Sequence, residues 1–212
     1  LVADTLKLTA LLGLLGLLKV INLPWLDALA LRPSQPVARS IWRGFSVGVA
    51  TLGVVVVVLL VLDVRELRTG LTLNAWIGAF IKSLIAALLV AVIEEVWFRG
   101  AVTNTLRPLG NTWALVLVAL SYAIVHFIRP DRVVSVPDQW WDGYYAMSGM
   151  FARMGDAANL DAFIALFCAG LVLGWLRLRE GSIYGAIACH ATWVLLIKLT
   201  QRTTVTNGES DH

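Results

Sequence analysis

Two adjacent glutamates and an arginine, Glu94, Glu95 and Arg99, interrupt a long apolar stretch of the sequence. Two histidines, His126 and His190, interrupt two later apolar stretches. A positioned carboxylate can act as a general base, and an imidazole can orient a reactant or donate a hydrogen bond to a developing negative charge. Brought together, these residue types have the chemistry needed to activate a water molecule for hydrolysis.

The composition of the chain makes charged residues at these positions unusual. Of the 212 residues, 58% are hydrophobic and 15% are charged, and the mean hydropathy is +0.78, whereas soluble domains contain about 25% charged residues. This balance predicts an integral membrane protein. The net charge of +3, spread over basic residues at the ends of apolar runs, indicates contact with the lipid bilayer and no nucleic-acid partner.

The apolar runs predict an all-α fold, a polytopic transmembrane helical bundle of about six spans. A helix needs about 20 apolar residues to cross a bilayer, and breaks rich in proline, glycine and arginine separate the runs. We expect a single membrane domain over 1–212, with a motif-bearing core at about 74–200 and a frayed polar tail at 203–212. The basic residues divide between both sides, so the positive-inside rule predicts no orientation. The predicted spans are 6–30, 42–62, 74–106, 111–128, 160–178 and 183–200.

The one long connection between predicted spans is the segment 129–159. Apolar side chains recur in it at helical spacing behind Asp138, a residue type suited to cap a helix. This pattern predicts an amphipathic helix at the membrane surface. Such a helix either packs against the bundle or forms a lid over a substrate site, and packing is the favoured interpretation. The apolar residues are Trp140, Tyr144, Met147, Phe151 and Met154.

Counting along the predicted helices places three of the polar residues at comparable depth. Glu94 and His126 each lie roughly 20 Å from the turn near 107–111, at about 1.5 Å per residue. His190 lies about 13 Å beyond a later turn, near Gly181, on the same side of the bundle. A modest helix tilt removes the difference. Three helices can therefore direct one carboxylate and two imidazoles at one point.

The adjacent glutamates must have separate roles. Neighbouring helix positions point about 100° apart, so Glu94 and Glu95 face different partners. Arg99 follows Glu95 by four residues, the spacing and order that favour an ion pair. This pairing leaves Glu94 to face the histidines as a general base. The alternative is a polar cluster that only ties helices together, but a charge at bilayer depth costs about 2.5–3.5 kcal/mol, which favours function.

The segments around these residues resemble the motifs of a known family. EEVWFR at 94–99 is similar to the EExxxR motif of intramembrane proteases related to the type II CAAX prenyl endopeptidase, also called the CPBP or Abi family. YAIVH at 122–126 resembles the second motif, FxxxH, with Tyr122 in place of phenylalanine. GSIYGAIACHATWV at 181–194 resembles the third, built around a histidine. The three motifs occur in the family's order on successive predicted spans.

The resemblance implies hydrolysis of a peptide bond inside the membrane by a glutamate-activated water. It implies that Glu94 deprotonates the water and that His126 helps to position it. His190 would stabilise the oxyanion, while Glu95 and Arg99 would hold the site together.

The third motif departs from the family pattern at one position. Some members carry an asparagine four residues after the motif histidine, where it would be a second oxyanion donor, and this chain has Val194 there. Valine cannot donate a hydrogen bond from its side chain. Thr192, Trp193, a backbone N–H or no group at all takes this role.

A glutamate and two histidines also form a zinc-compatible set. The chain lacks the HExxH spacing of helical metalloproteases, and glutamate-type hydrolysis needs no metal, so we expect no cofactor while zinc stays open. No predicted span carries a GxSG-type serine or a GxGD-type aspartate. Cys189 adjoins His190, but consecutive helix positions diverge by about 100°, so Cys189 and Cys168 are expected to be small core residues.

The prediction for the whole chain is an intramembrane endopeptidase that acts on a membrane-anchored protein or peptide. Two other classes stay open. A non-catalytic peptide-binding or bacteriocin-immunity protein is favoured by the missing asparagine, and a proton-coupled transporter would use the same polar residues as a relay. Internal inverted repeats, which would favour the transporter, are not found. The small size is typical of a bacterial member in the plasma membrane, and the sequence indicates no oligomeric state.

Overall fold

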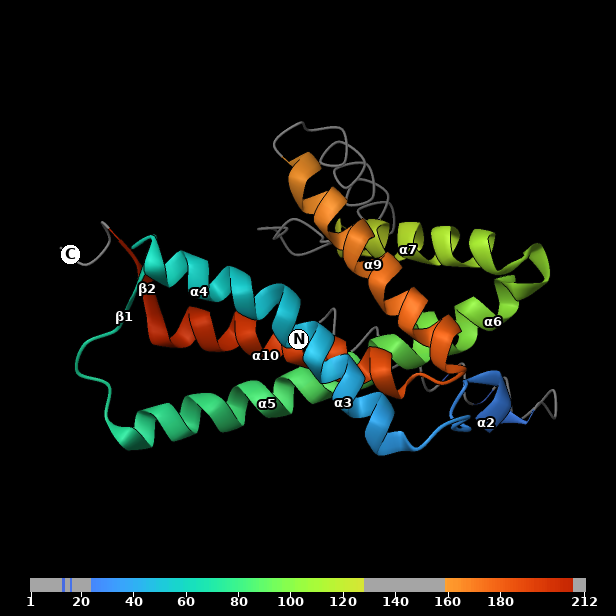
Figure 1. The fold of residues 1–212 in the computed structure, drawn as a ribbon, viewed down its shortest axis with the longest axis horizontal. Helices are drawn as coiled ribbons and strands as arrows, with labels where there is room; N and C mark the ends of the chain where they lie inside the picture. Colours follow the sequence, from blue (N-terminus) through green and yellow to red (C-terminus); the bar gives the residue numbers. More distant parts are fainter. Residues whose placement is uncertain (1–12, 14–15, 17–23, 128–158, 208–212) are drawn as a thin grey trace, which may run out of the picture.

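The computed structural model describes residues 13, 16, 24–127 and 159–207, and all structural statements concern these residues. They are mostly helical (Figure 1), which confirms the predicted helical bundle. The elements in chain order are α2 (Trp25–Ala28), α3 (Val37–Gly48), η1 (Val49–Gly53), α4 (Val54–Val61), β1 (Arg65–Leu67), α5 (Leu73–Glu95), η2 (Val96–Val102), α6 (Thr103–Leu106), η3 (Arg107–Leu109), α7 (Asn111–Phe127), α9 (Leu160–Glu180), α10 (Tyr184–Thr203) and β2 (Thr204–Thr206).

The longest helical segment carries the two glutamates. It begins where the Thr72 hydroxyl accepts a hydrogen bond from the Ala75 N–H at 3.3 Å, an N-cap arrangement, and it continues through α5, η2, α6 and η3. It ends at Gly110, whose φ of +96° is a conformation that glycine adopts readily. The segment η2, Val96–Val102, is a π-helix that follows Glu95 directly. Such irregularities are frequent at functional sites.

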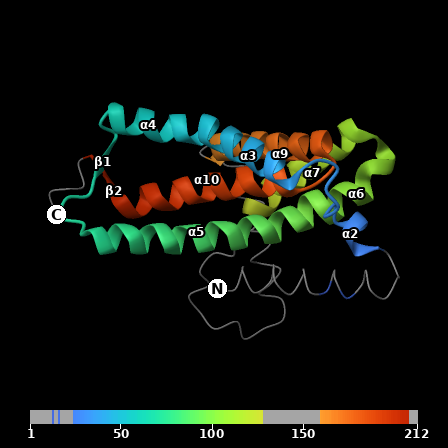
Figure 2. The same cartoon turned by 60° about the horizontal axis from the view of Figure 1, so that its bottom comes forward.

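Helix α10 lies between α3 and α5 (Figure 2). Glycines allow α3 to approach it closely: a Cβ at Gly44 would collide with the backbone of Gly185, and one at Gly48 would lie 2.7 Å from the Cβ of Thr192. Small residues at crossings are typical of membrane helices. Gly181, with φ of +69°, lets the chain turn from α9 into α10. The close crossing brings α3 into direct contact with α10.

Helices α7 and α9 pack against each other as a second unit of the bundle. A Cβ at Gly170 would lie 2.8 Å from the Cα of Ala119, and Gly174 packs against the side chain of Leu115. Both α7 and α9 contact η2, and α9 also contacts α10. The pair therefore meets the α3–α10–α5 layer around the π-helix, next to the glutamates.

Strands β1 and β2 form a short antiparallel pair at the ends of α4 and α10 (Figure 1). Arg65 Nε donates to Thr204 Oγ1 at 2.6 Å, and Thr203 and Thr204 are buried. The prediction of a frayed tail is therefore wrong for residues 203–206, because α10 continues to Thr203 and residues 204–206 pair with β1. Residues 208–212 lie outside the described part of the chain.

Three described helical segments are long and apolar enough to cross a membrane, namely Val37–Val61, Leu73–Leu109 and Leu160–Glu180. The predicted number of six spans is not confirmed. Helix α7 has only 17 residues, and α10 is less apolar because it carries His190, Lys198 and Arg202. The predicted span 6–30 lies mostly outside the described residues, as does the amphipathic segment expected at 129–159.

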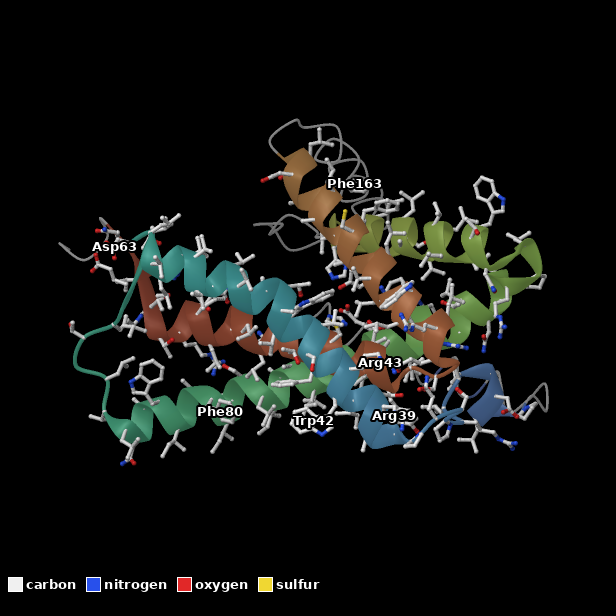
Figure 3. The ribbon with its side chains drawn as sticks, viewed as in Figure 1. Arg39, Trp42, Arg43, Asp63, Phe80 and Phe163 are labelled. Atoms are coloured by element: carbon white, nitrogen blue, oxygen red, sulfur yellow. The ribbon has the colours of Figure 1, made fainter. Side chains whose placement is uncertain are left out.

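The outer faces of the long helices are apolar. Trp42 on α3 is 66% exposed, and Phe80 on α5 is 46% exposed. Figure 3 shows both side chains directed away from the bundle. Lipid chains solvate such surfaces, and helices satisfy their backbone groups internally, as a bilayer requires. The exposed faces thus agree with a membrane location.

Candidate active site

Glu95 and Arg99 form the fixed part of the site. Glu95 ends α5, Arg99 lies in η2, and both side chains are fully buried. Arg99 Nη1 donates to Glu95 Oε1 at 3.0 Å, which confirms the predicted ion pair. Arg99 Nη2 donates to the carbonyl oxygen of Gly170 at 3.2 Å. Buried charges require a partner and further hydrogen bonds, and these contacts supply both while joining η2 to α9.

His190 reaches the same carboxylate from α10. Its Nδ1 lies 2.8 Å from Glu95 Oε1, the oxygen that Arg99 also contacts. Because the carboxylate is an acceptor, Nδ1 carries the hydrogen and donates it. Glu95 therefore orients the imidazole, as the carboxylate does in Ser-His-Asp triads. The sequence predicted the contact of Glu95 with Arg99 but not this one.

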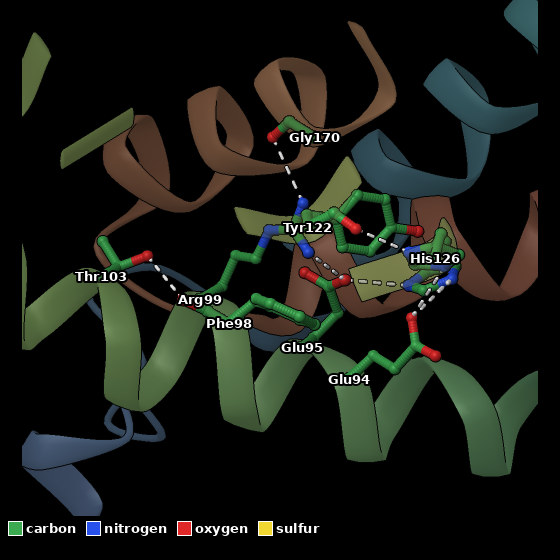
Figure 4. A network of polar contacts seen from close by, with 9 residues as sticks. Glu94, Glu95, Phe98, Arg99, Thr103, Tyr122, His126 and Gly170 are labelled. Carbon is green, nitrogen blue, oxygen red and sulfur yellow. Dashed lines mark hydrogen bonds and ion pairs between the residues drawn. The ribbon is translucent and has the colours of Figure 1, made fainter. Parts of the chain in front are cut away.

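Glu94 faces the imidazoles of His126 and His190, and Figure 4 shows its carboxylate directed toward His126. Its Oε2 lies 3.7 Å from His126 Nε2 and 3.9 Å from His190 Nε2, and the residue is 3% exposed. Both distances exceed that of a direct hydrogen bond and suit a bridging water. Helices α5, α7 and α10 and the π-helix η2 thus bring all five predicted side chains together. We call this group the glutamate–histidine cluster: Glu94, Glu95, Arg99, His126 and His190.

The contacts of the imidazole rings determine which nitrogen faces Glu94. His126 Nδ1 lies 2.7 Å from the carbonyl oxygen of Tyr122, so this nitrogen is the donor, as it is in His190. In the neutral form of each ring, Nε2 therefore directs a lone pair toward Glu94. With both rings neutral, two ionised carboxylates and one arginine leave the buried cluster with one excess negative charge.

Aromatic rings close one side of the cluster. The Arg99 guanidinium carbon lies 4.6 Å from the centroid of the Tyr122 ring and 5.8 Å from that of Phe98, within the range of cation–π attraction. The Tyr122 ring also lies 4.3 Å from the His126 ring and 6.1 Å from the His190 ring. Sequence reasoning treated Tyr122 only as a motif variant. Its position four residues before His126, on the same helix face, was the available signal.

The two side-chain donors near Val194 are engaged elsewhere. The Thr192 hydroxyl donates to the carbonyl oxygen of Ala188 at 2.8 Å. Trp193 Nε1 donates to Thr51 Oγ1 at 2.8 Å. Neither therefore takes the place of the asparagine found in some family members. Of the side chains in the third-motif segment, His190 is the one that lies beside Glu94.

The cysteines lie outside the cluster. Cys189 packs against Leu173, Leu176 and Ala186, as expected for a small core residue. Cys168 is exposed, so the prediction that it is a core residue is wrong. It precedes the buried Gly170 by two positions, which places it on the opposite side of α9. Among the described residues, no group of three or more histidine, cysteine, aspartate or glutamate side chains is arranged to hold a metal ion.

A comparison with protein families identifies the family of this chain. The protein-family model described as Type II CAAX prenyl endopeptidase Rce1-like matches residues 75–196. This match covers more than half of the chain and includes all five residues of the cluster. The chain belongs to this family. Membership confirms the resemblance to this family, and it indicates a hydrolase of the protease class. With the three apolar helices, it also indicates an integral membrane protein.

Searches among curated proteins and among solved structures gave no significant match.

Proposed function

We propose that this chain is a glutamate-dependent intramembrane endopeptidase that hydrolyses a peptide bond of a membrane-anchored protein or peptide. The observation that carries the proposal is the position of Glu94 Oε2, 3.7 Å from His126 Nε2 and 3.9 Å from His190 Nε2. Glu95 is committed to Arg99 and His190, so the two adjacent carboxylates have different environments. Membership in a prenyl endopeptidase family supports peptide-bond hydrolysis.

The attacking water would lie beside Glu94. One of its hydrogens would point to Glu94 Oε2 and the other to His126 Nε2, which leaves an oxygen lone pair for the carbonyl carbon of the substrate. As the new C–O bond forms, Glu94 takes the first proton. A general base of this kind typically accelerates a reaction by about 10²–10⁴-fold.

His190 would stabilise the oxyanion that forms on the carbonyl oxygen. In its protonated state it donates from Nε2, while Glu95 balances the imidazolium through Nδ1. When the C–N bond breaks, Glu94 passes its proton to the leaving amine. The products are a carboxylic acid and an amine, and every proton is accounted for.

The proposed substrate is anchored in the bilayer because the cluster lies among apolar helices. The proposed mechanism needs no metal or other cofactor. The proposed location is a bacterial plasma membrane. The matched family model names prenyl endopeptidases, so the substrate set for testing should include prenylated C-terminal peptides.

The direct test is cleavage of a library of membrane-anchored peptides by the purified full chain in liposomes. We expect Glu94→Gln to lower kcat by about 10²–10⁴-fold. Glu180→Gln is a matched control, because Glu180 is 1% exposed and pairs with Arg43 at 3.0 Å outside the cluster. Its kcat per folded molecule should equal that of the wild type.

A chelator added to the same assay separates the remaining possibilities. Cleavage that survives the chelator and is lost in Glu94→Gln supports the proposed mechanism. Cleavage lost on chelation would assign the cluster to a metal-dependent reaction. A wild-type chain that binds a peptide without cutting it, and binds equally well as Glu94→Gln, would overturn the protease in favour of a peptide-binding protein.

A further inference from the structure

Helix α9 carries a second buried arginine, Arg177, which the proposed chemistry does not use. The residue is 3% exposed. Its Nε donates to the carbonyl oxygen of Arg99 at 3.1 Å, and its Nη2 donates to Asn104 Oδ1 at 3.1 Å. The ion pairs between described residues do not include Arg177. Burying a cation among neutral dipoles is costly, so this position requires an explanation.

The π-helix gives a reason for a donor at the Arg99 carbonyl. In an α-helix, the N–H of Thr103 would bond to this carbonyl four residues earlier. Here the Thr103 N–H bonds to the carbonyls of Phe98 and Gly100, and the Thr103 hydroxyl also donates to the Phe98 carbonyl at 2.8 Å. Arg177 donates to the Arg99 carbonyl at the point where the helical hydrogen-bond register changes. A buried carbonyl requires such a partner.

Helix α9 also holds the other end of Arg99. The Gly170 carbonyl accepts from Arg99 Nη2 at 3.2 Å, and Gly170 precedes Arg177 by seven residues. Seven residues are two turns on one helix face, about 10 Å along the axis. On another side of η2, a Cβ at Gly100 would lie 2.9 Å from the carbonyl oxygen of Leu29. The backbone and the guanidinium of Arg99 are thus both held in place.

We propose that Arg177 is a positioning residue for the proposed hydrolysis. It holds the Arg99 backbone, Arg99 Nη1 contacts Glu95 Oε1 at 3.0 Å, and the same oxygen orients His190 Nδ1 at 2.8 Å. Displacement of η2 would move the carboxylate on which the His190 ring orientation depends. The effect on catalysis rests on the proposed function, whereas the effect on the His190 ring can be measured without a substrate.

The test compares Arg177→Gln and Arg177→Lys with Arg43→Gln in the full chain in detergent micelles. Lysine keeps the charge but lacks the fork that reaches two acceptors. Arg43 is a matched control, because it donates to Glu180 Oε1 at 3.0 Å on the same helix, three residues from Arg177, and lies outside this chain of contacts.

The first readout is the NMR signal of the His190 Nδ1–H in ¹⁵N-histidine-labelled protein, assigned with His190→Gln. Both Arg177 variants are expected to shift this signal, and Arg43→Gln is expected to leave it in place. An unshifted signal in both Arg177 variants would overturn the inference. Equal shifts in the Arg177 and Arg43 variants would overturn it as well, because Arg177 would then have only a general structural role.

The second readout is peptide cleavage. Both Arg177 variants are expected to lower kcat by about 10- to 100-fold, the loss typical of a small misplacement of catalytic groups, with little change in KM. Normal kcat in variants with a shifted His190 signal would overturn the positioning role. A shifted signal in a chain whose wild type cleaves nothing would support the contact chain and overturn the proposed function instead.

Discussion

Two groups of charged side chains in this molecule differ in their balance of positive and negative charge. The first, which we call the outer pair, joins Arg43 on α3 to Glu180 on α9 at 3.0 Å, and the arginine side chain is 33% exposed. The second is the glutamate–histidine cluster, which contains two carboxylates and one arginine, with Arg99 paired to Glu95. The outer pair is neutral and its arginine reaches water. In the cluster, both carboxylates and Arg99 are buried, the His126 side chain is 26% exposed, and one carboxylate is in excess of the arginine.

This difference distinguishes an ion pair that joins helices from a group of residues that can exchange protons. The outer pair matches one arginine with one carboxylate. The cluster instead places the Glu94 carboxylate 3.7 and 3.9 Å from the Nε2 atoms of two imidazoles, and both group types can accept and donate protons. Reversible proton transfer within such a group is what general acid–base catalysis requires.

Replacing the carboxylate that pairs with the arginine should give the largest difference in stability between the cluster and the outer pair. Glu95→Gln leaves the buried Arg99 without a counter-charge, and we expect the free energy of unfolding to fall by about 3–5 kcal/mol. Glu180→Gln should cost about 1–3 kcal/mol, since Arg43 can reach water. Unfolding in detergent micelles, followed by circular dichroism, measures both losses. Equal losses would contradict the contrast between enclosed and water-accessible charge.

The two histidines of the cluster should differ because their partners differ. His190→Gln removes the partner of a buried carboxylate, so it is expected to lower both stability and kcat, the latter by about 10²–10³-fold as for an oxyanion donor. His126→Gln removes a ring that is hydrogen-bonded to a backbone carbonyl oxygen. It should lower the free energy of unfolding by only about 1 kcal/mol while also lowering kcat. Paired kinetic and unfolding measurements test this. A larger stability loss for His126→Gln would reverse the assignment.

The helix crossing beside the outer pair should affect folding and not chemistry. Gly44→Ala forces a Cβ into the backbone of Gly185, and such overpacking typically costs about 1–3 kcal/mol. Gly78→Ala on α5 is the control, because nothing lies within 4 Å of a Cβ there and alanine favours the helix by about 0.5–1 kcal/mol. In thermal unfolding, Gly44→Ala should have a lower Tm than Gly78→Ala. The kcat per folded molecule should be the same in both variants. A lowered kcat in Gly44→Ala would show that this crossing also positions His190.

The smallest expected effect concerns the aromatic wall of the cluster. Tyr122→Leu removes the ring 4.6 Å from Arg99 and should cost about 0.5–2 kcal/mol beyond the loss of packing. Tyr122→Phe keeps the ring and restores the residue type of the family motif. Its stability and kcat should therefore stay close to those of the wild type. A large loss of kcat in Tyr122→Phe would instead give the hydroxyl a role in the reaction.

Much of the cluster could be predicted from short-range patterns. The spacing of four residues between Glu95 and Arg99 predicted their ion pair, and counts of helical rise placed Glu94, His126 and His190 at one depth. The exposed Cys168 was missed because a nearly uniform apolar run does not show which helix face turns inward. The pairing of β1 with β2 was missed because a polar segment at the end of a chain carries no signal for a partner far away in sequence.

The sequence by itself determined the helical membrane fold, the family and the five residues of the cluster, because these depend on residue types and on separations within or along single helices. Only the tertiary structure decided that Glu95 orients His190 and that Arg177 holds the carbonyl of Arg99. Those contacts join residues 95 and 78 positions apart. They depend on the rotation and crossing of helices and on the register of the π-helix, which arise from packing of the whole bundle.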